Sequence, residues 1–454
     1  MRLRDRFSAL TLIAAGGLAF VFLFAAGISA QVVIDPPRSA SVQKYLDPQG
    51  GMTADEAVRR AIDGNQELAA MRKEVEAGEQ LLRQAGLRAN PSLELGGERQ
   101  ISGMDKSYMV QGGIPLELGG RRAARKRIAE SELEIRRLAA AERERLLAGE
   151  VRTKFGEALA AILKLRFTEE MLEAAQRNFD LVAAQVEEGR RAPLERNIEA
   201  VELNRIRAMR EEAEAAAEIA LLDLRKLMGL APDAAMRLRG TLDVAPDALP
   251  LQADSVSAAL IRRTDLAGAR AVEQLAAARG AQARSEGRVD ADLMLGYQRM
   301  EAGFPFRAFD DAGMLMPIEN RMNFFTFGVR LSLPVFDRKQ GMVAAAKLEE
   351  EAAGKRREFG ELVVRREVAA AYVKFNRSVR AEQIYRVGVR DQAARNLEVV
   401  RQMYELGSRN LLDYIGELRR FIEAESGYID AQREAYMARI ELLRATNSEE
   451  LTGK

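Results

Sequence analysis

Residues Asn323 to Pro334, with the sequence NFFTFGVRLSLP, carry the pattern on which the fold depends. Apolar side chains occupy every second position of this stretch, namely Phe325, Phe327, Val329, Leu331 and Leu333. Successive side chains of a β-strand point to opposite faces, so a period of two places all of these residues on one face. The stretch therefore predicts a strand of about ten residues with one wholly apolar face.

Three further segments repeat this pattern more weakly. A shorter apolar face lies upstream of Asn323 to Pro334 and consists of Leu293, Leu295 and Tyr297. Ser92 to Gln100 and Tyr108 to Leu118 alternate polar residues and glycines with further apolar residues, which are Leu93, Leu95, Val110, Ile114 and Leu116. Alternating strands of about ten residues are what a membrane β-barrel requires. On this pattern alone, an ordinary half-buried antiparallel sheet is the alternative.

A very long helix is predicted after each pair of strands. Proline breaks helix interiors, and the longest proline-free intervals are 116–192 and 335–454. Both are rich in Ala, Leu, Glu and Arg, so we expect helices from about Arg121 to Glu188 and from about Arg338 to Tyr404. Each would be on the order of 100 Å long at about 1.5 Å per residue, which is too long for a compact globule.

Strands and helices together favour an assembly of chains over an ordinary sheet. Four strands cannot close a barrel, because the smallest membrane barrels have about eight. Three chains would contribute about twelve strands, closing the sheet edges and giving the long helices partners. The expected fold class is mixed α and β, mainly helical, with two tandem repeats that each contain a transmembrane β-hairpin and very long helices, assembled as a trimer.

The chain is an internal repeat. Asn65 to Arg72 aligns with Arg263 to Arg270, and Leu93 to Gly96 aligns with Leu293 to Gly296. Pro115 then aligns with Pro334 and Gly189 with Gly407, at an offset larger by about nineteen residues. We place the additional residues in a longer loop at Ala302 to Arg321 of the second copy, because this stretch contains Gly and Pro.

The alignment divides the chain into two copies with short flanking segments. Repeat 1 is expected at 52–229, with a β-hairpin at about 92–118 and a tip turn at about 189–193. Repeat 2 is expected at 255–446, with a β-hairpin at about 290–334 and a tip turn at about 405–411. The remaining parts are an extended N-terminal segment at 31–51, a connecting segment at 230–254 and a C-terminal tail at 447–454.

The N-terminus predicts export. Residues 1–8 carry three arginines, and an apolar run from Ala9 to Ala26 follows them. Small residues at 27–30 then provide a cleavage site before Gln31, so we assign a signal peptide to 1–30. A permanent membrane anchor is the alternative, because a run of about eighteen apolar residues is just long enough to span a bilayer. The chain has no Cys, which excludes a lipid anchor attached to this segment.

Composition excludes several classes of function. The 454 residues include no His, Cys or Trp, and 69 Lys and Arg balance 68 Asp and Glu. Serine–histidine or cysteine–histidine catalysis, thiol redox chemistry and disulfides are therefore absent. The balanced charge gives no reason to expect a nucleic-acid partner. Glycine pairs such as Gly96-Gly97 do not precede the Lys-Ser/Thr of a phosphate loop. We expect no catalytic residue, no cofactor and no resident metal site.

One basic cluster has two interpretations. It follows the second predicted strand and consists of Arg121, Arg122, Arg125, Lys126 and Arg127. Contact with lipid headgroups where a barrel meets the helices is one interpretation, and a solvated helix start is the other.

Four segments resemble a known family in their order, duplication and spacing. Two are strand-to-helix junctions, at Ile114 to Arg122 and at Leu333 to Gly341. The other two are helix turns, at Glu188 to Leu194 and at Glu405 to Asp413. Over essentially the whole mature chain, this arrangement resembles the TolC-type outer membrane efflux proteins. The junctions are most similar to the heavy-metal-efflux branch, the CzcC/CusC-like channels.

The resemblance implies a homotrimer with a twelve-stranded barrel in the outer membrane and an α-helical tunnel in the periplasm. It implies a passive channel that docks a periplasmic adaptor protein and an inner-membrane RND-type pump. Heavy-metal cations are the favoured substrate, with efflux of drugs or other small molecules, or type I secretion, as alternatives. An exported coiled-coil scaffold is less favoured, because it predicts no duplicated β-hairpin.

The resemblance also implies a gate around the helix tips. The family's tyrosine, arginine and aspartate match Tyr404, Arg409 and Asp413 here, and the first copy retains Arg191 and Glu195 at the equivalent positions. The family's further acidic position is Gly416 in this chain, with Glu417 adjacent. Because Arg409 and Asp413 are four residues apart, an ordinary exposed helix pair is the alternative.

The adaptor contacts implied by the family fall on the tip turns. They correspond here to Gly189, Arg190, Gly407 and Ser408. A purely local reason for the glycines is the alternative, because Gly readily adopts the positive φ that ends a helix.

Overall fold

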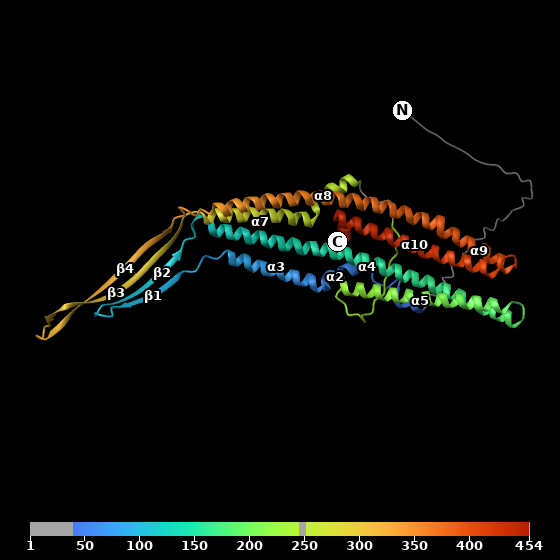
Figure 1. The fold of residues 1–454 in the computed structure, drawn as a ribbon, viewed down its shortest axis with the longest axis horizontal. Coiled ribbons are helices and arrows are strands. Elements are labelled where there is room, and N and C mark those ends of the chain that lie inside the picture. The colour runs from blue at the N-terminus through green and yellow to red at the C-terminus, as the bar shows by residue number, and fades with distance from the viewer. Residues whose placement is uncertain (1–39, 245–250, 454) are drawn as a thin grey trace, which may run out of the picture. The chain divides into compact units, whose positions relative to one another are not determined.

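A computed structural model describes residues 40–244 and 251–453 of the chain. The expected signal peptide at 1–30 lies outside the described residues. Within the unit formed by Ser39–Lys454, the strands lie at one end of the long helices and the two tip turns at the other (Figure 1).

Each copy contains two shorter helices, a pair of strands, a long helical stretch and a returning helix in the same order, which confirms the expected fold class. Helix α1 (Ala40–Tyr45) precedes the first copy, so part of the segment that was expected to be extended is helical. The first copy comprises α2 (Ala54–Gly64), α3 (Gln66–Ala85), β1 (Ser92–Arg99), β2 (Lys106–Pro115), the 3₁₀ turn η1 (Leu118–Gly120), α4 (Arg121–Glu187) and α5 (Pro193–Leu227). The second comprises α6 (Gln252–Arg262), α7 (Thr264–Glu286), β3 (Asp290–Phe309), β4 (Leu315–Ser332), α8 (Gln340–Ile384), the π-helical turn η2 (Tyr385–Arg390), α9 (Asp391–Glu405), α10 (Leu411–Thr446) and the 3₁₀ turn η3 (Glu449–Leu451).

The two long helices differ in continuity. Helix α4 runs for 67 residues without interruption, whereas the second copy has the π-helical turn η2 between α8 and α9. At this turn Tyr385 lies against α10, where a Cβ on Gly427 would come within 2.8 Å of its ring. Arg390 forms an ion pair with Glu425 at 2.7 Å and lies over the ring of Tyr428. The wider π-helical turn thus coincides with the place where two large side chains contact α10.

The strands form one antiparallel sheet in the order β1-β2-β3-β4. The expected loop at Ala302 to Arg321 is wrong, because β3 extends to Phe309 and β4 begins at Leu315. Most of the additional residues of the second copy therefore lengthen its hairpin. Pro305 lies at a bulge between Phe304 and Arg307, where the ladder does not require the N–H that proline lacks. Gly and Pro in this stretch mark a bulge and a tight turn instead of a long loop.

The strand register joins the apolar residues into one continuous face. Residues directly opposite each other share a face, and three such rows cross the sheet: Ile114, Leu293 and Val329; Leu93, Gly112, Leu295 and Phe327; Leu95, Val110, Tyr297 and Phe325. This face is exposed in the single chain, with Phe325 and Phe327 at 72% and 78% of full exposure. No helix among the described residues is both long enough and apolar enough to cross a membrane.

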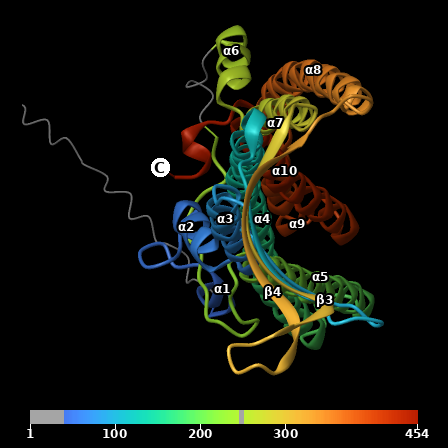
Figure 2. The same ribbon diagram turned by 90° about the vertical axis from the view of Figure 1, so that its left-hand side faces the viewer.

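The helices pack around several cores along their length. The largest core packs α2, α4 and α5 with the segment around Leu238, and another packs α6 and α8 with the last turns of α10. Viewed from the strand end, α1, α2 and α6 lie on one side of the long helices (Figure 2).

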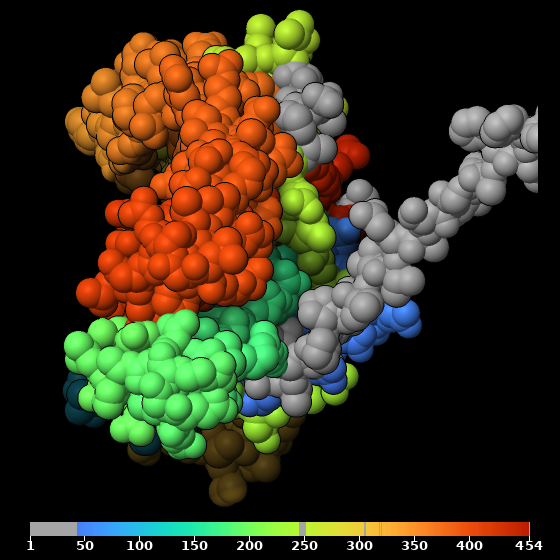
Figure 3. Space-filling model, turned by 90° about the vertical axis from the view of Figure 1, so that its right-hand side faces the viewer, coloured from blue at the N-terminus to red at the C-terminus, as the bar shows by residue number. Residues whose placement is uncertain are grey.

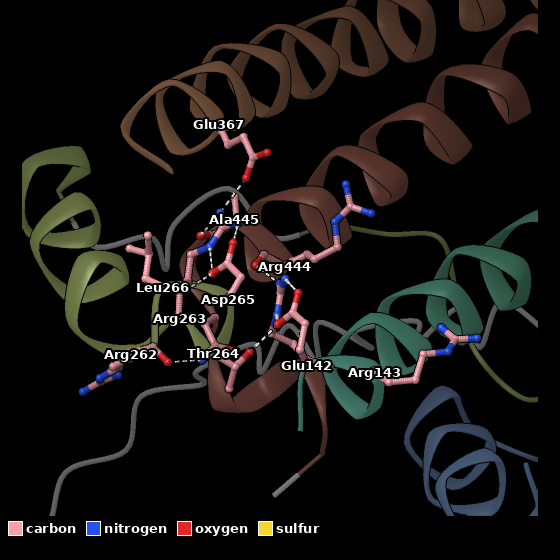
Figure 4. A network of polar contacts seen from close by, with 12 residues as sticks. Glu142, Arg143, Arg262, Arg263, Thr264, Asp265, Leu266, Glu367, Arg444 and Ala445 are labelled. Atoms are coloured by element: carbon pink, nitrogen blue, oxygen red, sulfur yellow. Dashed lines mark hydrogen bonds and ion pairs between the residues drawn. The ribbon is translucent and has the colours of Figure 1, made fainter. Parts of the chain in front are cut away.

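A polar network fixes the junction between α6 and α7 against the long helices (Figure 4). Arg263 is 5% exposed, and its guanidinium contacts Asp265 at 2.6 Å and Glu367 of α8 at 2.6 Å. On the neighbouring helix α4, Arg145 bonds to Glu142 and to the carbonyl of Arg444. Arg263 thus joins α8 to the start of α7, and Arg145 joins α4 to the end of α10.

We expect Arg263→Ala to lower the free energy of unfolding by about 2–3 kcal/mol, because it leaves two carboxylates beside a buried site without their counter-charge. Arg262→Ala is the matched control, since the neighbouring side chain is exposed, and we expect it to change stability by less than about 0.5 kcal/mol. The melting temperature of each variant measures the effect. Equal shifts for both variants would contradict this role of Arg263.

Candidate functional site

The first helix tip ends in a glycine turn. Gly189 has φ 72°, the left-handed conformation that only glycine adopts without strain. Its N–H donates to the carbonyl of Val186 at 3.0 Å, and the N–H of Arg190 donates to that of Gln185 at 2.8 Å. These bonds satisfy the last carbonyls of α4 in a Schellman motif. Pro193 then occupies the first turn of α5, where its missing N–H has no consequence.

The second tip repeats this backbone arrangement. Gly407 has φ 74°, and its N–H donates to the carbonyl of Tyr404 at 3.0 Å, while the N–H of Ser408 donates to that of Met403 at 2.9 Å. Asn410 caps α10 by accepting a bond from the N–H of Asp413 at 2.9 Å. The two tips lie side by side at the end of the helices (Figure 3).

The residues expected to dock an adaptor are all exposed at these tips. They are Gly189, Arg190, Gly407 and Ser408, and each has a local contact or conformation of its own. Arg190 pairs with Glu188, and the hydroxyl of Ser408 donates to the carbonyl of Met403. Leu406 beside them is 84% exposed. The turn geometry accounts for both glycines, and the docking role stays a prediction.

Three of the five residues expected in a gate meet between the tips. Arg191 of the first turn donates to the carboxylate of Glu195 at 2.8 Å and to the hydroxyl of Tyr404, and its guanidinium lies 4.7 Å from the centre of the Tyr404 ring. Tyr404 is buried, and its ring is stacked on that of Tyr414 at 5.6 Å. Arg191 therefore links the hairpin of the first copy to that of the second.

Arg409 and Asp413 lie apart from this contact. They form an ion pair of 3.6 Å across one turn at the start of α10, with side chains 55% and 41% exposed. An exposed pair at this spacing contributes only a few tenths of a kcal/mol. Within one chain, Arg409 and Asp413 therefore form the exposed pair that the sequence analysis gave as the alternative to a gate. Their role in a gate stays a prediction.

Two buried carboxyl groups near the tips were missed by the sequence analysis. Glu199 of α5 is 3% exposed and accepts a hydrogen bond from Asn178 of α4 at 2.8 Å. Burial, together with the negative charge of Glu202, raises the pKa of Glu199 to about 7. The signal was present in the sequence, because both residues share a helical stripe with the apolar Leu203 and Ile206.

Glu202 provides a second link between the hairpins. It is 1% exposed, and it contacts Arg205 at 2.6 Å and Arg419 of α10 at 2.7 Å. Burial opposes its ionisation, but the hydrogen bonds from both arginines hold its pKa below the usual range. The α4–α5 and α9–α10 hairpins are thus joined at two levels, by Arg191 with Tyr404 and by Glu202 with Arg419.

The basic cluster at the start of α4 serves a structural purpose that neither interpretation anticipated. Arg122 donates to the carbonyl of Gly86 at 2.6 Å, and Arg125 donates to those of Ala85 and Leu87. These bonds satisfy carbonyls at the end of α3. Arg121 forms an ion pair with Asp290 of β3 at 3.0 Å. Much of the cluster's charge therefore joins α3 and the sheet to α4.

In the part of the chain that the structure describes, no group of three or more acidic side chains is arranged to hold a metal ion. The site is a junction of two helical hairpins, at the opposite end of the long helices from the apolar-faced sheet (Figure 1). This duplicated combination of β-hairpins and long helices defines a protein of the channel type. The family model for outer membrane efflux proteins matches residues 57–230 and 255–448, and the chain belongs to this family. Members are efflux channels of the outer membrane and not enzymes.

Individual relatives match this chain at low sequence identity. The cobalt-zinc-cadmium resistance protein CzcC of Cupriavidus metallidurans is 24% identical over 394 residues, which cover 86% of this chain and 88% of CzcC. The solved structure of CusC matches with a TM-score of 0.70 at 16% identity, covering 87% of this chain and 91% of CusC. The CmeC outer membrane channel of Campylobacter jejuni matches with a TM-score of 0.71 at 14% identity, covering 88% and 85%.

The pKa of Glu199 predicts how stability depends on pH. Because its folded-state pKa is raised from 4.5 to about 7, the protonated carboxyl stabilises the fold below pH 4.5, and this contribution is lost as pH rises to about 7. We expect Glu199→Gln, which keeps an acceptor for Asn178, to remove this loss and raise the melting temperature above pH 7.

The measurement is the melting temperature of both proteins between pH 4.5 and 8. Glu211→Gln, which removes an exposed carboxylate from the same helix, is the matched control and should keep the wild-type dependence. The same pH dependence in Glu199→Gln and the wild type would rule out Glu199 as its source.

Proposed function

We propose that this chain forms a homotrimer in the outer membrane that passively conducts substrate from the periplasm to the exterior. The observation that carries the proposal is the apolar sheet face. The apolar alternation from Phe325 to Leu333 extends over about nine residues, which is about the length of a tilted transmembrane β-strand. Among the described strands, β1 and β4 each have an outer edge without a neighbour. Three copies joined at these edges would form a closed barrel of twelve strands.

The helices would continue this barrel as a tunnel in the periplasm. A periplasmic adaptor would contact the tips around Gly189, Arg190, Gly407 and Ser408, and an inner-membrane RND-type pump would supply the energy. The exposed turns and the apolar surface of Leu406 support a docking role. The channel itself would contribute only an opening equilibrium that adaptor binding shifts.

Heavy-metal cations are the proposed substrate class. CzcC is described as a cobalt-zinc-cadmium resistance protein, and its similarity extends over most of both chains. The tunnel would not select the ion, because the chain has no His or Cys to hold a soft metal. Selection would then lie with the pump.

A pair of variants on one strand tests the barrel. Phe327→Arg places a charge on the apolar face, and we expect a cost of about 2–4 kcal/mol per chain that abolishes heat-modifiable trimers in the outer membrane fraction. Thr326→Arg, one residue away on the opposite face, is the control and should leave the trimers intact. The proposal would be contradicted if both variants formed trimers equally well, or if the wild type were a soluble monomer.

The same strains test the substrate. With the matching pump and adaptor present, we expect cells producing the wild-type chain to tolerate several-fold more cobalt, zinc or cadmium than cells producing Phe327→Arg. Tolerance to drugs but not to metals would assign the channel to small-molecule efflux.

We propose that Arg191, Glu195 and Tyr404 hold the tip closed, and that Arg409 and Asp413 act with neighbouring chains of the trimer. Arg191→Ala removes the link between the hairpins at the tip and leaves the link between Glu202 and Arg419 in place. Losing a charged hydrogen bond of about 1.5–3 kcal/mol would favour opening by roughly 10- to 100-fold. Single-channel conductance in planar bilayers measures this, with Arg190→Ala as the control at the adjacent exposed position. Unchanged conductance in Arg191→Ala would exclude it from the gate.

A further inference from the structure

A row of charged residues crosses the sheet immediately beyond its apolar face, toward the hairpin turns. Arg99, Lys106, Glu301 and Arg321 lie directly opposite one another across the four strands. Arg299 lies in the adjacent row, opposite Tyr108 and Asn323. We name these five charged residues the basic row, since four cations accompany a single carboxylate.

The basic row is on the same face as the apolar residues. Toward the hairpin turn, Arg321 lies four residues from Phe325 on β4, and Arg299 lies two residues from Tyr297 on β3. The charges therefore begin about 7 Å beyond the last apolar row and reach about 13 Å, measured along the strands. With strands tilted by about 40°, this is the depth of the headgroup region next to a hydrocarbon core. Exposed Tyr108 and Tyr297 lie at this boundary, as aromatic residues of membrane proteins do.

The cations of the basic row are only partly neutralised within the chain. The carboxylate of Glu301 forms ion pairs with both Arg299, at 2.8 Å, and Arg321, at 3.7 Å. Arg99 and Lys106 face each other directly, and within the described residues no ion pair or hydrogen bond engages either side chain. Like charges opposite each other destabilise a strand pair, so an anion from outside the chain would relieve this contact.

The opposite face of the same rows lacks this charge. At the alternate positions of β1, β2, β3 and β4 lie Glu98, Ser107, Met300 and Met322. The positive charge is thus confined to the face that bears the apolar surface. An anion that meets both features carries phosphate next to acyl chains.

We infer that the basic row binds the phosphate groups of phosphorylated lipids in the outer leaflet of the outer membrane. The inference rests on the proposed barrel, which places this face toward lipid and the hairpin turns toward the exterior. A guanidinium group can donate two parallel hydrogen bonds to the oxygens of one phosphate. Arg99, Arg299 and Arg321 each provide such a group. Such contacts would fix the depth of the barrel in the membrane.

The test uses the purified full-length trimer and bisphosphorylated lipid A, with binding measured by native mass spectrometry. We expect the triple variant Arg99→Gln, Arg299→Gln and Arg321→Gln to bind at least about tenfold more weakly than the wild type. Arg330→Gln is the matched control, because it removes a cation from the opposite face of β4, and its affinity should stay within about twofold.

Dephosphorylated lipid A and inorganic phosphate complete the experiment. We expect the wild type to bind the dephosphorylated lipid as weakly as the triple variant binds lipid A. Equal binding of both lipids by the wild type, unchanged binding by the triple variant, or equally tight binding of inorganic phosphate alone would overturn the inference. If trimers form in the membrane but their lipid binding does not depend on phosphate, only this inference is contradicted. If no trimers form, the proposed function is contradicted.

Discussion

The structure depends on one constraint, which is that the apolar face and the two outer edges of the sheet need partners from outside the chain. Within the described part of the chain, four strands present a continuous apolar face to solvent and leave the outer edges of β1 and β4 without partners. Neither feature is stable in water, because exposed edges invite pairing and exposed apolar surface favours burial. A closed barrel in lipid removes both costs at once. The long helices have a corresponding need, since helices of this length are stabilised by neighbours along their whole length.

Duplication repeats the backbone arrangement while allowing the side chains to diverge. Both tips end in the same Schellman motif, yet Val186 of the first copy corresponds to Tyr404 of the second. The divergence allows Arg191 of one copy to contact Tyr404 of the other, a contact that two identical copies would lack.

The same principle applies at the other end of these helices. Asn65, at the start of α3, donates to the carbonyl of Leu227 at 3.2 Å. Its counterpart Arg263 donates to the carbonyl of Ala445, which is the equivalent position of the returning helix. One backbone requirement, a donor for the last carbonyls of a long helix, is therefore met by two different side chains. The larger side chain also recruits Glu367 of α8.

The sequence by itself determined the strands, the apolar face, the long helices and the glycine tips. Each depends on local rules, namely side-chain alternation, the absence of proline and the positive φ of glycine. Only the tertiary structure decided which side chains meet across elements. It paired Arg191 with Tyr404, buried Glu199, directed Arg125 to the end of α3 and extended the second hairpin through a bulge. These outcomes depend on how helices and strands distant in sequence pack together, and no local pattern encodes that geometry.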